Sequence, residues 1–167
     1  MKGLEMEFNT AFGFVPIDKR RTISKPRKSG ITMVSDYQLG LASLSDLIEV
    51  AGHYIDLFKI ATGTSRLFEK THLQAKIEML RANDIRPFLG GQFQEYVLHT
   101  MGVDAMPRHL SEAQALGFDI IEISDNMVQL GQGLRQQLFD MVRDQGMTPV
   151  GEIGDKRESS SILSIID

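Results

Sequence analysis

The sequence predicts an α/β fold in which short helices alternate with the strands of a parallel sheet. The main observation is a recurring pattern: an amphipathic helical stretch ends at Gly or Asn, and a β-type run follows. The four stops are Gly52, Asn83, Gly117 and Gly146. Gly and Asn tolerate the left-handed backbone conformation that ends many helices. Helix and strand alternating at this spacing are typical of a parallel sheet.

Five β-type runs set the number of predicted βα units. They are Ile31–Ser35, Ile55–Ile60, Arg86–Leu89, Asp119–Ile123 and Pro149–Ile153. Successive runs begin 24 to 33 residues apart. Such units fit two architectures. One is a complete five-stranded doubly wound sheet of flavodoxin type, and the other is the first five units of a (β/α)8 barrel.

Apolar periodicity predicts the helices between these strands. Leu44, Leu47 and Ile48 share one face behind Ser43, which is the expected N-cap. Pro107 suits the first turn of a helix. The remaining helices are expected over residues 71–81, 93–101, 107–116, 134–145 and 159–166.

Charged residues inside three strands favour one of the two architectures. Lys59, Glu122 and Glu152 each interrupt an apolar run. Helices cover both faces of a doubly wound sheet, where an unpaired charge costs several kcal/mol. In a barrel, a charge near the carboxyl end of a strand points into the mouth. The expected fold is therefore a (β/α)8 TIM barrel with about the first five βα units present. Residues 1–29 are expected to form an irregular basic segment before a partial barrel domain, residues 30–167.

Composition restricts the class of protein and its partners. The chain has 42% apolar residues, no cysteine and no run approaching the ~18 apolar residues of a membrane span. Neither disulfides nor a membrane partner are expected, and the polar N-terminus favours the cytoplasm. Basic residues cluster from Lys19 to Lys28. Because the remainder is acidic and no aromatic residues alternate with the cluster, no nucleic-acid partner is expected.

Polar residues at the strand ends are expected to converge at the mouth of the barrel. Carboxylates there can hold a hard cation such as Mg²⁺, a lysine can act as acid or base, and glycine turns expose N–H groups to oxyanions. The candidates are Asp36, Lys59, Arg66, Gly90, Gly91, Glu122, Ser124, Asp125, Glu152 and Lys156. Structural alternatives remain open. Lys59 can pair with Glu122 or Glu152 inside the protein, and Asp36 and Asp125 can cap helices.

Five motifs resemble phosphosulfolactate synthase in their order and spacing. They are residues 25–36, 51–66, 90–91, 117–125 and 151–156. The family is a (β/α)8 barrel that adds sulfite to phosphoenolpyruvate with Mg²⁺, on the route to coenzyme M. Plant heat-stress-associated 32 kDa proteins share the family. Residues 85–96 resemble that branch and its bacterial relatives more than the archaeal enzyme.

The resemblance implies a Mg²⁺-dependent lyase that acts on phosphoenolpyruvate and sulfite. It implies catalytic roles for Lys59 and Lys156. Substrate binding is implied for Arg66, Gly90, Gly91 and Ser124, and metal binding for Asp36, Glu122, Asp125 and Glu152. The alternative is a non-enzymatic stress-associated homologue that serves as a protein-interaction module. A homo-oligomer is expected in either case, because a half-open barrel exposes apolar edges.

Overall fold

A five-stranded parallel sheet forms the centre of this computed structural model, which describes residues 11–16, 18, 20, 22 and 24–152. The strands are β1 (Met33–Asp36), β2 (Leu57–Ile60), β3 (Arg86–Leu89), β4 (Ile120–Ile123) and β5 (Thr148–Gly151). Their order in the sheet is β1-β2-β3-β4-β5, and every neighbouring pair is parallel. A flavodoxin-type sheet has the order 2-1-3-4-5. The sequential order therefore confirms the prediction of a partial (β/α) barrel.

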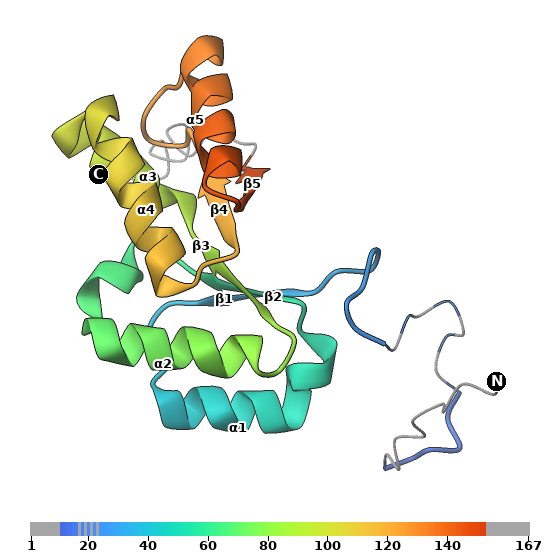
Figure 1. Cartoon of the computed structure of the whole chain (residues 1–167). Helices are drawn as coiled ribbons and strands as arrows, with labels where there is room; N and C mark the ends of the chain where they lie inside the picture. Colours follow the sequence, from blue (N-terminus) through green and yellow to red (C-terminus); the bar gives the residue numbers. More distant parts are fainter. Residues whose placement is uncertain (1–10, 17, 19, 21, 23, 153–167) are drawn as a thin grey trace, which may run out of the picture.

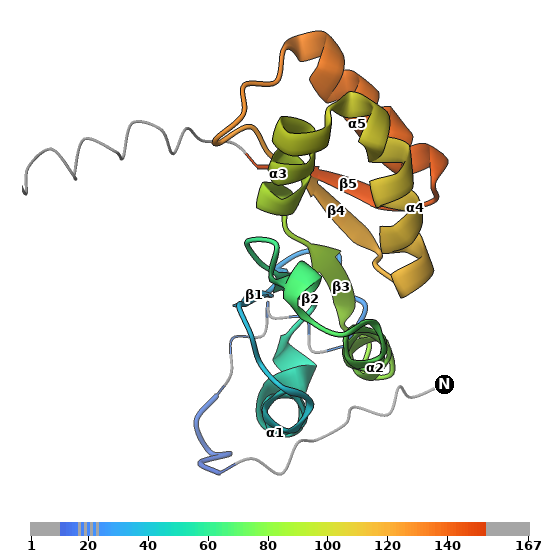
Figure 2. The ribbon, with the colours of Figure 1, turned by 90° about the vertical axis from the view of Figure 1, so that its left-hand side faces the viewer.

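Helical segments connect each strand to the next. They are α1 (Leu41–Ala51), η1 (Gly52–Tyr54), η2 (Thr64–Leu67), α2 (Lys70–Arg81), α3 (Gly91–Met101), η3 (Val103–Ala105), α4 (Met106–Leu116) and α5 (Gln132–Asp144). The helices α1 and α2 lie side by side near β1 and β2, while α4 and α5 lie near β4 and β5 (Figure 1). The connection from β3 to β4 contains two helices, and the first of them, α3, continues from the carboxyl end of β3 (Figure 2).

Several predicted helix ends were wrong, and the positive φ expected at Asn83 occurs at Asp84. The helix α1 begins at Leu41 behind Gly40, so Ser43 lies inside the helix and does not cap it. Gly52 has a right-handed φ of −54°, and the chain continues into the 3₁₀ turn η1. Gly117 and Gly146 do take positive φ values of 97° and 73°, as predicted. The helix expected over residues 159–166 lies outside the described residues.

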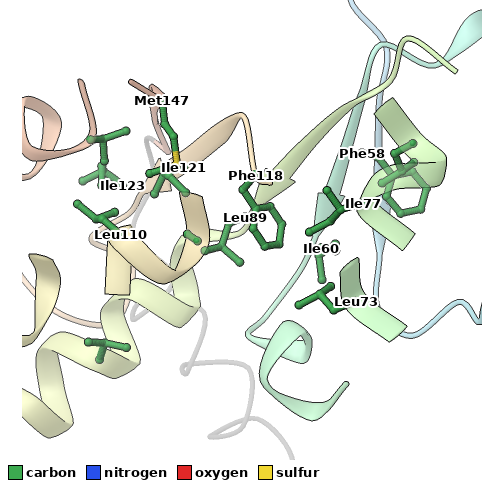
Figure 3. Packing of buried hydrophobic residues seen from close by; sticks show 14 of the residues in the cluster. Phe58, Ile60, Leu73, Ile77, Leu89, Leu110, Phe118, Ile121, Ile123 and Met147 are labelled. Carbon is green, nitrogen blue, oxygen red and sulfur yellow. The ribbon is translucent and has the colours of Figure 1, made fainter. Parts of the chain in front are cut away.

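Alternating strand residues separate the sheet into two faces. Phe58, Ile60 and Ile121 belong to the hydrophobic core that packs against the helices (Figure 3). Lys59 and Phe88 are register partners on the other face, here called the inner face. Burial of apolar side chains beneath the helices is the main stabilising contribution to this layer. The inner face is left to carry polar groups, as the barrel prediction requires.

Part of the basic N-terminal cluster anchors the chain to the segments that precede β2 and β3. The Lys25 ammonium donates to the carbonyl oxygens of Gly52 and Asn83, at 2.6 and 3.2 Å. Arg27 pairs with Asp56 at 2.8 Å, and their side chains are only 6% and 7% exposed. Burial lowers the pKa of Lys25. Lys25 and Arg27 therefore have a structural role, because they attach the N-terminal segment to the rest of the domain.

A fully buried ion pair ties α2 to the end of β1. Lys76 on α2 contacts one carboxylate oxygen of Asp36, and both side chains are 0% exposed. The other Asp36 oxygen accepts backbone N–H groups from Gln38 and Leu39, at 3.0 and 2.7 Å. The Lys76 ammonium also donates to the Leu39 carbonyl at 2.6 Å. Burial of these charges is tolerated because each has its partner.

Replacing Lys76 by Met leaves the Asp36 carboxylate buried without its counter-charge. We expect Lys76→Met to lower the free energy of unfolding in urea by about 3–5 kcal/mol. The matched control is Lys70→Met on the same helix, where the side chain is 62% exposed and 3.7 Å from Glu112. That control should cost at most about 1 kcal/mol. Equal costs for the two variants would contradict a structural role for the pair.

Candidate active site

An ion pair on the inner face joins β2 to β4 across β3. The Lys59 ammonium lies 2.7 Å from one carboxylate oxygen of Glu122, with side chains 15% and 6% exposed. The second Glu122 oxygen accepts the backbone N–H of Gly91 at 2.7 Å. Phe88 on β3 lies beneath, with its ring centre 5.7 Å from the Lys59 nitrogen. Lys59 is thus held by a carboxylate whose own position is fixed from α3.

The two glycines after β3 allow α3 to approach β4 closely. A Cβ atom on Gly91 would lie 2.8 Å from the Ser124 Cβ and 3.0 Å from the Glu122 Cγ. A Cβ on Gly90 would lie 3.0 Å from the Ile60 carbonyl oxygen. The Gly90 N–H donates to that same carbonyl at 3.0 Å. Both glycine N–H groups therefore have protein acceptors. To bind a substrate anion, as predicted, each N–H group would have to leave its present acceptor.

The loop after β4 carries three polar residues that contact other parts of the mouth. The Ser124 hydroxyl donates to Glu95, and the Ser124 N–H donates to the Gln94 side chain at 3.2 Å. The Asn126 amide donates to Glu152, which follows β5. Asp125 pairs with Arg135 of α5. Lys59, Gly90, Gly91, Glu122 and Ser124 thus form one contiguous group of predicted residues.

Other predicted residues lie apart from this group. Asp36 belongs to the buried pair with Lys76. Arg66 lines a cavity of about 670 Å³ between α2, α3 and α4, whose lining includes neither Lys59 nor Glu122. Lys156 lies outside the described residues.

The predicted Mg²⁺ ligands do not converge on one point in the part of the chain that is described. Asp36 and Asp125 face the cations of Lys76 and Arg135. Both oxygens of Glu122 already accept hydrogen bonds. Within residues 24–152 and the few described residues before them, no three carboxylate or imidazole groups are placed to hold a metal ion. These residues therefore do not fit a shared magnesium site in the arrangement that the structure shows.

Comparison with known proteins gives the family. Residues 20–166 match the (2R)-phospho-3-sulfolactate synthase (ComA) family. The chain belongs to this family. The resemblance seen in the five motifs is thereby confirmed.

Three curated relatives place the chain within the family. The phosphosulfolactate synthase of Methanothermobacter thermautotrophicus is 36% identical over 132 residues, which is 79% of this chain and 50% of that protein. The phosphosulfolactate synthase of Methanocaldococcus jannaschii is 30% identical, with coverages of 83% and 54%. Protein HEAT-STRESS-ASSOCIATED 32 of Arabidopsis thaliana is 25% identical, with coverages of 74% and 43%. This member of the synthase family thus spans about half the length of these relatives.

No helix in the described part of this family member is both long and apolar enough to cross a membrane.

The structure brings three residues into the mouth that the sequence analysis did not select. Gln94, Glu95 and Asn126 are 1%, 2% and 0% exposed. A signal was present in the sequence: with a helix starting at Gly91, positions 94 and 95 fall on its buried face at i+3 and i+4. The predicted start at Phe93 is two residues late, so it leaves Gly91 outside the helix and this spacing out of the pattern.

The close approach of α3 to β4 yields a stability prediction. Gly91→Ala forces its new methyl group against Ser124 and Glu122, so we expect a loss of about 1–3 kcal/mol in urea unfolding. The matched control is Gly133→Ala in α5, where a Cβ meets nothing within 4 Å. Since Ala favours helix over Gly, that control should be neutral or stabilising by up to about 1 kcal/mol. Gly91→Ala behaving like the control would contradict the close packing.

A buried histidine in the cavity wall yields a pH prediction. Burial lowers the pKa of His109 from 6.5 to about 4. The unfolded chain therefore binds more protons between these values, and stability rises with pH across the window. We expect wild type to lose up to about 3 kcal/mol through this group between pH 6.5 and 4. His109→Phe should show a shallower slope in urea unfolding at stepped pH, and identical slopes would disprove the effect.

Proposed function

We propose that this chain carries the acid–base part of a phosphosulfolactate synthase site, which adds sulfite to phosphoenolpyruvate. The supporting observation is Lys59. Its side chain is 15% exposed and lies on the inner face of the sheet, and a Glu122 carboxylate, which also accepts the Gly91 N–H, holds its ammonium at 2.7 Å. An ammonium that is held in a fixed position and is partly exposed on the inner face of the sheet can act as a general acid.

In the proposed reaction, Lys59 is the proton donor. The sulfur lone pair of sulfite attacks C3 of phosphoenolpyruvate, and a C–S bond forms. The electron pair of the C2–C3 π bond moves to C2 and is delocalised into the adjacent carboxylate. Lys59 then transfers a proton to C2, and solvent returns a proton to the lysine. The phosphate ester is retained, so the product is phosphosulfolactate.

Glu122 orients the acid in this proposal. Its charge-assisted hydrogen bond is stronger and more directional than a contact with water, so the ammonium is held in one place before the substrate arrives. Ser124 contributes an oxygen rather than a proton, since its hydroxyl already donates to Glu95. Arg66 and Lys156 are the cations proposed to hold the substrate anions. The Mg²⁺ requirement that the family resemblance implies is tested by assays with Mg²⁺ and with a chelator.

Mutation of Lys59 tests the proposed role directly. With phosphoenolpyruvate, sulfite and Mg²⁺, we expect Lys59→Met to lower product formation at least about 100-fold, because Lys59 is the proton donor to C2 in this proposal. Product is measured by mass spectrometry. The double variant Lys59→Met/Glu122→Gln removes the unpaired carboxylate as well, so its inactivity cannot be attributed to a buried lone charge. Lys70→Met is the surface control and should retain full turnover.

An intact rate in Lys59→Met would end the general-acid assignment. Absence of product from folded wild type would instead favour the interaction module. One observation supports that second function: Ile31, Met33 and Tyr37, in and beside β1, are 45%, 46% and 59% exposed. Exposed apolar groups at a sheet edge favour association with another protein or a second copy. Light scattering of the purified protein then tests the proposed homo-oligomer.

A further inference from the structure

One face of α3 is directed into the mouth of the partial barrel. Gln94 and Glu95 lie one turn after Gly91 on this helix, and all three are buried. Gly91 donates to Glu122, Gln94 accepts from the Ser124 N–H, and Glu95 accepts from the Ser124 hydroxyl. The same helical face therefore contacts both β4 and the residues that follow it. We call residues Ser124–Val128 the β4 loop.

Glu95 is the main attachment of the β4 loop. One carboxylate oxygen accepts the Ser124 hydroxyl, and the other accepts the backbone N–H groups of Met127 and Val128 at 2.5 and 2.7 Å. The side chain is 2% exposed. None of the ion pairs formed among the described residues includes Glu95. Hydrogen bonds from the loop thus compensate for its burial, and no cation does so.

This attachment reaches Glu152, which follows the neighbouring strand β5. Asn126 lies in the middle of the β4 loop, is 0% exposed, and donates its side-chain amide to Glu152. The Glu152 N–H in turn donates to the Ile123 carbonyl at 3.0 Å, directly before the loop. Fixing the loop therefore fixes the place of a second carboxylate, which follows β5, the strand paired with the one that carries Glu122.

We propose that Glu95 is a positioning residue of this site. It holds Ser124 with its hydroxyl proton turned toward α3, and it holds Asn126 where Asn126 can orient Glu152. The catalytic consequence rests on the proposed sulfite addition, whereas the attachment of the loop does not. Glu95 itself touches no reacting atom in this proposal, and its effect on turnover passes through Ser124, Asn126 and Glu152.

Hydrogen exchange tests the attachment independently of activity. In Glu95→Ala, the N–H groups of Met127 and Val128 lose their acceptor, and we expect their exchange rates to rise at least about tenfold. Glu95→Gln keeps an oxygen acceptor at the same place and should give a smaller rise. Exchange within residues 85–90 should stay unchanged in both variants. The matched control is Glu112→Gln on α4, whose side chain is 57% exposed and should leave the β4 loop unaffected.

Turnover per folded molecule tests the catalytic consequence. With phosphoenolpyruvate and sulfite, we expect kcat to fall about 10- to 100-fold in Glu95→Ala and less in Glu95→Gln. KM for phosphoenolpyruvate should change less than about threefold, since Glu95 makes no substrate contact. The folded fraction is measured by circular dichroism, because a purely structural defect would lower the amount of active protein and leave its kcat intact.

The outcomes separate the two proposals. Unchanged exchange in the β4 loop of Glu95→Ala overturns the attachment. Raised exchange with an unchanged kcat overturns the positioning role. If wild type itself forms no product, the proposed function fails, and the exchange measurement alone decides whether Glu95 holds the loop. Should Glu95→Ala not fold, Glu95→Gln carries the same comparisons with smaller expected changes.

Discussion

The contact that the rest of the mouth depends on is the one between Lys59, Glu122 and the Gly91 N–H. It joins β2, β4 and the first residue of α3, and it spans β3 on the inner face. A half-buried ammonium on a sheet is costly unless a carboxylate lies within hydrogen-bonding distance. The carboxylate, in turn, is fixed because the amide end of a helix points at it. The three groups therefore stabilise one another in these positions.

That arrangement makes α3 the organising helix of the site. A side chain larger than hydrogen at position 91 would separate the helix from Ser124 and Glu122. With Gly at 91, the next turn brings Gln94 and Glu95 against the β4 loop. An N–H of the helix thus replaces water as a partner of the buried Glu122 carboxylate, and groups of the β4 loop replace water around Glu95. Gly91 sets the position of the helix, and Gln94 and Glu95, one turn further along, make the contacts with the β4 loop.

Much of the fold could be predicted from the sequence, because strands and helix stops follow local rules. The charges within otherwise apolar strands were sufficient to favour a barrel over a doubly wound sheet, and the strand order agrees. The site was harder to predict from the sequence. Lys76 looks like an ordinary helix-surface lysine, and only the fold places it against Asp36. Glu95 depends on where α3 begins, and helix starts are among the least certain features of a sequence.

The mouth holds more negative than positive charge among its described residues. Among the described residues in and around the β4 loop there are two cations, Lys59 and Arg135, and four carboxylates, those of Glu95, Glu122, Asp125 and Glu152. Phosphoenolpyruvate and sulfite are both anions, and like charges a few ångströms apart repel strongly in a partly buried site. Binding therefore needs positive charge beyond this group. The proposed sources of that charge are Arg66, which lines the cavity between α2, α3 and α4, and Lys156, which follows β5 in the sequence. In this proposal the anions are held by groups outside the mouth, while the proposed proton donor, Lys59, lies within it.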